Sequence, residues 1–221
     1  MNASMTSGIR AVCVAIAVIV VVALPGSAGA IPFAEFGDAG DLPGVAQAAG
    51  VLPVLTRISG SIGSSTDADM FAITVSTFGR VSATTVGTPG TLFDPQLFLF
   101  AFPGTGRLAN DDSMFTLQAT LPGTLLQPGL YFLGISAFDR DPVSAGGLIF
   151  PSTPFSGVFG PTGPGGGSPI IGWEGTGFST PGTYAVDLQL TPVPEPATLL
   201  LLGTTMAGIG LTARRKLRRQ Q

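Results

Sequence analysis

The residues of this chain best suited to chemistry are short clusters of carboxylates in its central part. They are Asp67/Asp69, Asp94, Asn110/Asp111/Asp112 and Asp139/Asp141, all at expected strand ends or in loops. Calcium takes roughly six to eight oxygen ligands, and clusters of this kind supply them. The best candidate ligands are Asn110, Asp111 and Asp112, followed by Asp67 and Asp69. The alternative is that these side chains cap turns, a role that Asp and Asn favour.

The residue types present exclude most catalytic sites. The chain has no histidine, its single cysteine is Cys13, and residues 31–192 contain no lysine. Ser-His-Asp, Cys-His and Ser-Lys sites are therefore excluded, as are zinc sites of the usual His or Cys kind. A glycosidase with paired carboxylates stays open. Its cleft would be poor, because the loops are rich in Gly and Pro and offer few aromatic residues beyond Phe. We expect no enzyme.

The central part of the chain is strongly acidic. Residues 31–192 contain four arginines and twelve acidic residues, a net charge of −8, whereas the whole chain has −3 because basic residues cluster at its end. This balance disfavours nucleic acid as a partner and could attract divalent cations. With no cysteine in residues 31–192, no disulfide framework is expected.

Elements that position these carboxylates must be strands. Apolar and polar residues alternate with period two between turn-forming residues, which is typical of half-buried strands. The expected strands are residues 70–76, 79–86, 96–101, 114–119, 129–138 and 183–190. Residues 44–52 are the one weak helical candidate. The pattern predicts an all-β domain, a β-sandwich of jelly-roll type, over residues 31–192.

Residues 141–181 form a long Gly/Pro-rich insertion in this domain. Its low-complexity part, residues 157–167, reads as a loop, and its glycines lack the strand, helix and lysine of a phosphate site. A structureless stretch of this length is usually functional or disordered. The single tryptophan, Trp173, either stacks on a sugar ring or covers the end of the sandwich.

Residues 1–30 are typical of a secretory signal peptide. Arg10 is the only charge, residues 11–24 are apolar, and Ala28-Gly29-Ala30 supplies a small-x-small cleavage site. The sequence predicts export through the inner membrane with cleavage after Ala30.

Residues 193–221 have the plan of a membrane-inserted address. Residues 197–213 carry no charge, and as a helix they would span roughly 25 Å, the lower limit for crossing a bilayer. Basic residues follow and favour a cytoplasmic C-terminus. They are Arg214, Arg215, Lys216, Arg218 and Arg219. An ordinary C-terminal anchor is the alternative to a sorting address.

This tail resembles the PEP-CTERM sorting signal, which exosortases of Gram-negative bacteria recognise. The resemblance rests on Val193-Pro194-Glu195-Pro196, the single predicted transmembrane helix and the basic end, in that order. It implies that an exosortase cuts the chain at or near Pro194-Glu195-Pro196. The freed protein would then pass to the cell surface or the exopolysaccharide matrix.

Residues 55–138, with 182–190 as a last strand, resemble bacterial pre-peptidase C-terminal domains. The resemblance rests on four segments in the expected order: residues 67–75, 94–100, 110–113 and 128–136. The long insertion at 141–181 departs from that family. The resemblance implies a non-catalytic accessory domain, and some members bind calcium or help binding to insoluble polymers.

Together these features predict a non-catalytic protein of the cell surface or biofilm matrix, exported and then cut by an exosortase. Its expected partners are the exosortase and, transiently, the inner membrane, with exopolysaccharide a further candidate and no nucleic acid. The alternative is a calcium-dependent polysaccharide-binding module. Apart from calcium, no cofactor is expected.

Overall fold

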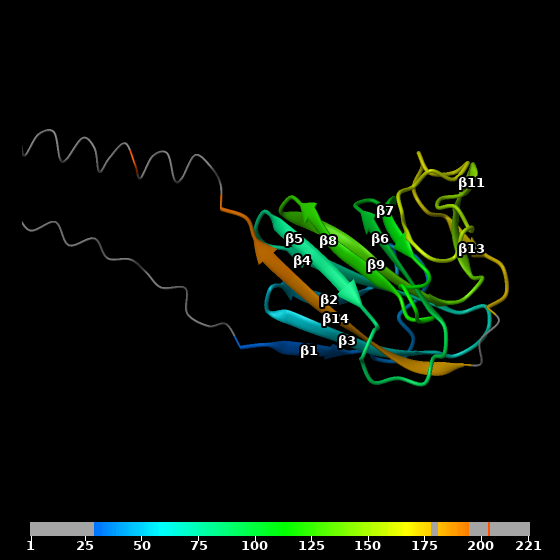
Figure 1. The fold of residues 1–221 in the computed structure, drawn as a ribbon, viewed down its shortest axis with the longest axis horizontal. Coiled ribbons are helices and arrows are strands. Elements are labelled where there is room, and N and C mark those ends of the chain that lie inside the picture. Colours follow the sequence, from blue (N-terminus) through cyan, green and yellow to red (C-terminus); the bar gives the residue numbers. More distant parts are fainter. Residues whose placement is uncertain (1–28, 178–180, 195–202, 204–221) are drawn as a thin grey trace, which may run out of the picture.

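Three β-sheets make up the part of the chain that the structure describes (Figure 1). The structure is a computed structural model and describes residues 29–177, 181–194 and 203. The predicted all-β fold is confirmed for these residues, and the jelly-roll topology stays a prediction. Residues 1–28 of the predicted signal peptide (residues 1–30) lie outside the described residues. So does the apolar tail, apart from Gly203.

The first sheet has five strands in the spatial order β1-β3-β14-β5-β8. Its strands are β1 (Ile31–Ala34), β3 (Leu55–Ile62), β14 (Gly182–Pro192), β5 (Gly79–Thr84) and β8 (Thr120–Leu126). Strand β1 runs parallel to β3, whereas β14 runs antiparallel to it. The start of β1 and the end of β14 therefore lie at the same end of the sandwich (Figure 1).

The second sheet has six strands in the spatial order β12-β7-β6-β9-β4-β2. Its strands are β12 (Val158–Phe159), β7 (Thr105–Asn110), β6 (Pro95–Ala101), β9 (Gly129–Ala137), β4 (Ala68–Val75) and β2 (Gln47–Leu52). The helix predicted for residues 44–52 is wrong, because β2 pairs in parallel with β4. A short segment with weak helical periodicity gains more from pairing with an open sheet edge than from an isolated helix.

The main core lies between these two sheets and is filled by alternate side chains of their strands. Phe71, Ile73 and Val75 of β4 point into it, as predicted, together with alternate residues of β14. Strand β6 is buried on both faces because the main core covers one face and a second hydrophobic cluster covers the other. Leu97 and Leu99 belong to the main core, and Phe98 and Phe100 belong to the second cluster.

The described part of the 141–181 segment forms a third layer on the outer face of the six-stranded sheet. It contains a small sheet of β10 (Asp141–Ser144), β11 (Gly147–Leu148) and β13 (Gly172–Glu174). Figure 1 shows β11 and β13 beside β7, β6 and β9. Apolar side chains of the segment cover Phe98 and Phe100 of β6. They are Ile149, Phe150, Ile170 and Trp173.

The Gly-rich part of the 141–181 segment is packed rather than structureless. A Cβ added at Gly166 would collide with the carbonyl group of Pro161, and one at Gly165 with that of Gly147. Glycine is therefore required by close backbone approach at these two positions. Apart from the two-residue strand β12, residues 157–167 form a loop as predicted. This loop packs through its backbone, although its composition is low in apolar side chains.

The strand predicted for residues 114–119 is also wrong. The amide of Ser113 donates to Gln118 O at 2.8 Å, and the amide of Thr116 donates to Ser113 O at 3.1 Å, which closes a tight turn. Phe115 at the apex has φ of 70° and is 98% exposed. The residues alternate in polarity, but no neighbouring strand accepts them, and β8 begins only at Thr120.

Candidate functional site

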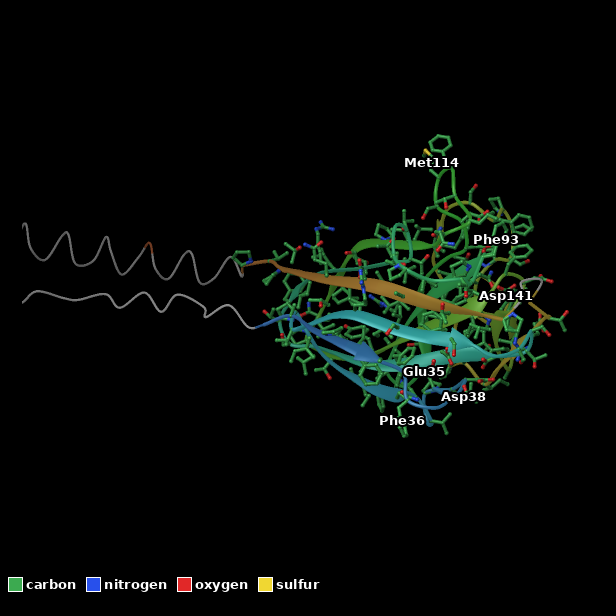
Figure 2. All side chains as sticks on the ribbon, turned by 90° about the horizontal axis from the view of Figure 1, so that it is seen from below. Glu35, Phe36, Asp38, Phe93, Met114 and Asp141 are labelled. Carbon is green, nitrogen blue, oxygen red and sulfur yellow. The ribbon has the colours of Figure 1, made fainter. Side chains whose placement is uncertain are left out.

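Most carboxylates of the domain lie at the end opposite to Pro192. Strands β4, β9, β6 and β7 are successively antiparallel, so the start of β4, the end of β9, the start of β6 and the end of β7 share one end of the sheet. Pro192 pairs with Gly79, which follows the far end of β4. In Figure 2 the labels of Glu35, Asp38 and Asp141 lie to the right of the end at which β1 begins and β14 finishes.

The first group of carboxylates, which we call the Asp69 cluster, consists of Glu35, Asp38 and Asp69. One oxygen of each lies within 4.8 Å of the others. Asp69 is fully buried, its Oδ2 accepts a 2.6 Å hydrogen bond from the Tyr184 hydroxyl group, and its Oδ1 has no hydrogen-bond partner. Glu35 accepts hydrogen bonds from the amides of Ala39 and Ser61, at 2.9 and 2.7 Å.

Burial dominates the electrostatics of the Asp69 cluster. The pKa of Asp69 is raised to about 8, by burial first and also by the charges of Glu35 and Asp67, against the lowering effect of the Tyr184 hydrogen bond. The pKa of Tyr184 is also raised, by burial first and then by Asp69. Gly60 leaves the necessary room, since a Cβ there would collide with Glu35 Oε2 and the Tyr184 hydroxyl oxygen.

An open pocket of about 490 Å³ lies beside the Asp69 cluster and is lined by three carboxylates, those of Asp38, Asp41 and Asp67. Burial raises the pKa of Asp41, and the neighbouring charge of Asp67 adds to that effect. Asp67 Oδ2 accepts a hydrogen bond from the amide of Gly63. The pocket is therefore acidic and built on loops, with oxygen atoms as its functional groups.

The second group, which we call the Asp111 cluster, consists of Asp94, Asp111 and Asp112. Asp94 immediately precedes β6, and the other two follow β7, which pairs with β6. One oxygen of each lies within 4.8 Å of the others, and Oδ1 of each is buried without a hydrogen-bond partner. Burial raises the pKa of Asp111 to about 8 and that of Asp94 to about 6.

Asn110 is held in backbone hydrogen bonds instead. Its Nδ2 donates to Asp112 O at 2.8 Å and to Gly157 O at 2.6 Å, and its Oδ1 accepts from the amide of Thr120 at 2.6 Å. These bonds anchor the loop after β7 to β8 and to the insertion. Asn110 thus orients the neighbouring aspartates.

The structure divides the predicted ligands between two places. Asp69 joins Glu35 and Asp38, whereas Asp111 and Asp112 join Asp94. Asp67 lines the open pocket, and Asp141 accepts a 3.3 Å hydrogen bond from Gln96 Nε2. Sequence reasoning missed Glu35 and Asp38, because nothing in a single sequence links them to a residue more than thirty positions away.

Trp173 lies against the outer face of the six-stranded sheet. Its ring meets that of Phe98 edge-on, with centroids 5.4 Å apart, and its Nε1 donates to Asp41 O at 2.7 Å. The side chain is 9% exposed. The interpretation of Trp173 as a sugar-stacking platform is therefore wrong, and its ring belongs to the second hydrophobic cluster.

The predicted sorting motif begins where the folded domain ends. The amide of Val193 donates to Phe78 O at 3.0 Å, and the next residue, Pro194, is exposed. Glu195, Pro196 and the basic residues Arg214, Arg215, Lys216, Arg218 and Arg219 lie outside the described residues. Within the part of the chain that is described, no helix has the length and apolar character of a membrane span.

Comparison with known proteins identifies the end of the chain. Residues 192–216 match the family profile of the PEP-CTERM protein-sorting motif, which implies exosortase-dependent sorting of an exported protein. No curated protein matches the chain significantly. Among solved structures, it is similar to Salmonella Typhimurium PliG, a periplasmic lysozyme inhibitor of g-type lysozyme, at 15% identity and a TM-score of 0.28. That match covers 72% of this chain and 98% of that one, and its low score supports no argument about function.

The comparisons do not confirm the resemblance of residues 55–138 to pre-peptidase C-terminal domains, which stays a prediction. The sorting motif implies a secreted precursor, anchored in the membrane and sorted to the cell surface, with an exosortase as its partner.

Proposed function

We propose that this chain is a non-catalytic protein of the cell surface or exopolysaccharide matrix, and that an exosortase cuts it at Pro194-Glu195-Pro196. The observation that carries the proposal is the place of the sorting motif. The match begins at Pro192, the last residue of β14, so the motif starts where the folded domain ends. A cut after Val193 leaves every described strand and its hydrogen bonds intact.

The geometry of the two ends supports the same proposal. The start of β1 and the end of β14 lie at one end of the sandwich, and the carboxylate clusters lie at the other. A precursor held at its C-terminal end would therefore turn its acidic loops away from the membrane. Residues 31–192 contain no histidine, cysteine or lysine, which supports a binding or structural role over a nucleophilic one.

The proposal is tested by following the full chain in a Gram-negative host with and without an exosortase. We expect intact mass measurement to show released protein that begins at Ile31 and ends near Pro194, only when the enzyme is present. Replacing Pro194, Glu195 and Pro196 with Ala should retain the precursor in the membrane. The control changes Gln189 and Thr191, exposed residues of β14, to Ala and should be processed normally. Released protein ending at Gln221 would contradict the proposal.

A second candidate function is calcium-dependent binding of polysaccharide at the Asp69 cluster. One observation favours it: Asp69 is fully buried, yet its Oδ1 has no hydrogen-bond partner and lies beside Glu35 and Asp38. A buried carboxylate without a partner is costly, and a cation would compensate its charge. The adjoining 490 Å³ pocket is wide enough for sugar hydroxyl groups to approach.

Titration calorimetry tests this candidate, first with calcium and then with extracellular polysaccharide from the host. We expect polysaccharide to bind the full chain only when calcium is present. Asp69→Asn and the exposed Asp38→Asn should both abolish this binding. Asp187→Asn, which removes a carboxylate paired with Arg57, should retain it. Equal binding in chelator would overturn the candidate.

A further inference from the structure

We propose that Asp94, Asp111 and Asp112 form a divalent-cation site of the oxygen-ligand type, which fixes the exposed turn at residues 113–118. This inference goes beyond the sorting proposal and does not depend on it. It also concerns different residues from the Asp69 cluster, so the two groups can be tested one at a time.

Each of the three neighbouring carboxylates has a buried oxygen without a hydrogen-bond partner. The Oδ1 atoms of Asp94, Asp111 and Asp112 are each removed from solvent, and none accepts a hydrogen bond. One oxygen of each residue falls within 4.8 Å of the other two. Buried polar atoms in folded proteins nearly always have partners, and three neighbouring carboxylates that each carry an unsatisfied buried oxygen point to a common partner.

Like charges surround Asp111. The charges that act on its carboxyl group are those of four other acids: Asp94, Asp112, Asp141 and Asp139. Burial acts first, and together with this repulsion it raises the pKa of Asp111 to about 8. These like charges lie close together around a buried carboxyl group, and a bound cation would offset them. A divalent cation satisfies all three carboxylates at once.

Hydrogen bonds hold the backbone around the cluster in place. Asp112 donates its amide to Phe155 O at 3.2 Å, and the Asn110 side chain holds Asp112 O and Gly157 O. The backbone is thus fixed by other groups, and the carboxylate oxygens are left free. Ligands whose backbone is held by a second set of hydrogen bonds are the arrangement that metal sites require.

Three carboxylates from two loops suit a hard cation. Calcium accepts carboxylates together with carbonyl oxygens and waters in flexible geometry, whereas the cluster offers no nitrogen or sulfur for zinc. The turn that carries Met114 and Phe115 follows Asp112 directly, and these two side chains are 79% and 98% exposed. A cation at the cluster would therefore fix the base of an apolar projection, labelled at Met114 in Figure 2.

The test is a thermal unfolding series on the full chain in mild detergent at pH 7.5, read by the fluorescence of Trp173. The cation is calcium, compared with chelator and with sodium chloride of equal ionic strength. The Asp38→Asn background removes the other cluster. In that background, calcium should raise the Tm by several degrees, and sodium chloride should not.

Asp111→Asn should abolish the calcium effect. In chelator it removes a carboxyl group that lies among like charges, so its Tm should be no lower than that of the Asp38→Asn parent. In calcium it removes a ligand, so the Tm gain should be lost. Asp94→Asn and Asp112→Asn repeat the test at other ligands, and Asp187→Asn is the control that should keep the gain. A calcium shift that survives these three cluster substitutions, or a parent with no calcium shift, would overturn the proposal.

Calcium calorimetry of the parent adds a measurement that needs no cluster variant. A cation that binds the three carboxylates should give a binding heat that is absent when sodium chloride of equal ionic strength is injected. Absence of any binding heat in every buffer would count against the site.

Discussion

The hydroxyl group of Tyr184 donates a 2.6 Å hydrogen bond to Asp69 Oδ2 and so links the two sheets at the acidic end of the sandwich. Tyr184 lies on β14 and Asp69 on β4, 115 positions apart in the chain. Both side chains are buried. The bond satisfies Oδ2 of the buried carboxyl group, and several measurable consequences arise from this part of the fold.

Tyr184→Phe removes that bond while keeping the ring in the core. We expect it to lower the free energy of unfolding by about 1–3 kcal/mol, because both oxygens of Asp69 then lack a partner. Chemical unfolding at neutral pH measures the change. Tyr131→Phe is the matched control, since its hydroxyl group bonds an exposed carbonyl, Gln127 O, and its loss should cost little. Equal effects of the two substitutions would contradict this assignment.

The stability of the cation-free protein should fall as pH rises from about 4 to about 8. The pKa values of Asp69 and Asp111 are raised to about 8, and those of Asp94 and Asp141 to about 6. A carboxyl group whose pKa is higher in the folded state stabilises that state below its unfolded pKa near 4, and loses this contribution as pH passes its folded pKa.

Chemical unfolding in chelator across this pH range measures the slope. Asp69→Asn should reduce the slope of the upper half of the profile, between about pH 6 and 8, because one of the two groups with a pKa near 8 is gone and Asp111 remains. A wild-type profile that rises with pH over this range would be incompatible with the raised pKa values.

Gly60→Ala should destabilise the protein, because its Cβ collides with Glu35 and with the Tyr184 hydroxyl group, both fixed by hydrogen bonds. We expect a loss of about 1–3 kcal/mol, as for other overpacked core positions. Gly63→Ala is the matched control. Gly63 directly follows β3, the strand that contains Gly60, and a Cβ added there meets only Asp67 Oδ2 at 3.4 Å. Similar unfolding midpoints for both variants would argue against a tightly packed Asp69 cluster.

Trp173→Ala should lower the free energy of unfolding by about 3–5 kcal/mol, because a large ring leaves the cluster between the insertion and β6. Trp173→Phe should cost less, since the ring contact with Phe98 persists and only the bond to Asp41 O is lost. Far-UV circular dichroism during chemical unfolding measures both. Phe36→Ala, at an 89% exposed position, is the control and should change stability by less than about 0.5 kcal/mol. If Trp173→Ala behaved like Phe36→Ala, the insertion would not be a packed layer.

Sequence periodicity predicted the strands that line the main core. Phe71, Ile73 and Val75 point inward as expected, and so do Val186, Leu188 and Leu190. Alternation identifies such strands because one face of each meets the core and the other does not. Periodicity predicted the wrong structure for residues 114–119, where the alternation is present but no partner strand lies alongside. It was also wrong for β2, where pairing with β4 overrides a weak helical pattern.

The amino-acid sequence alone determined the chemistry available to this protein and the address at its end. Acidic loops without histidine or lysine, and a motif at residues 192–216, are properties of residue order and are visible without a fold. Only the tertiary structure decided which carboxylates share a place, because Asp69 meets Glu35 and Asp111 meets Asp94 through strand pairing across many residues. It also decided that Trp173 is buried, since what a side chain packs against depends on segments that the local sequence does not contain.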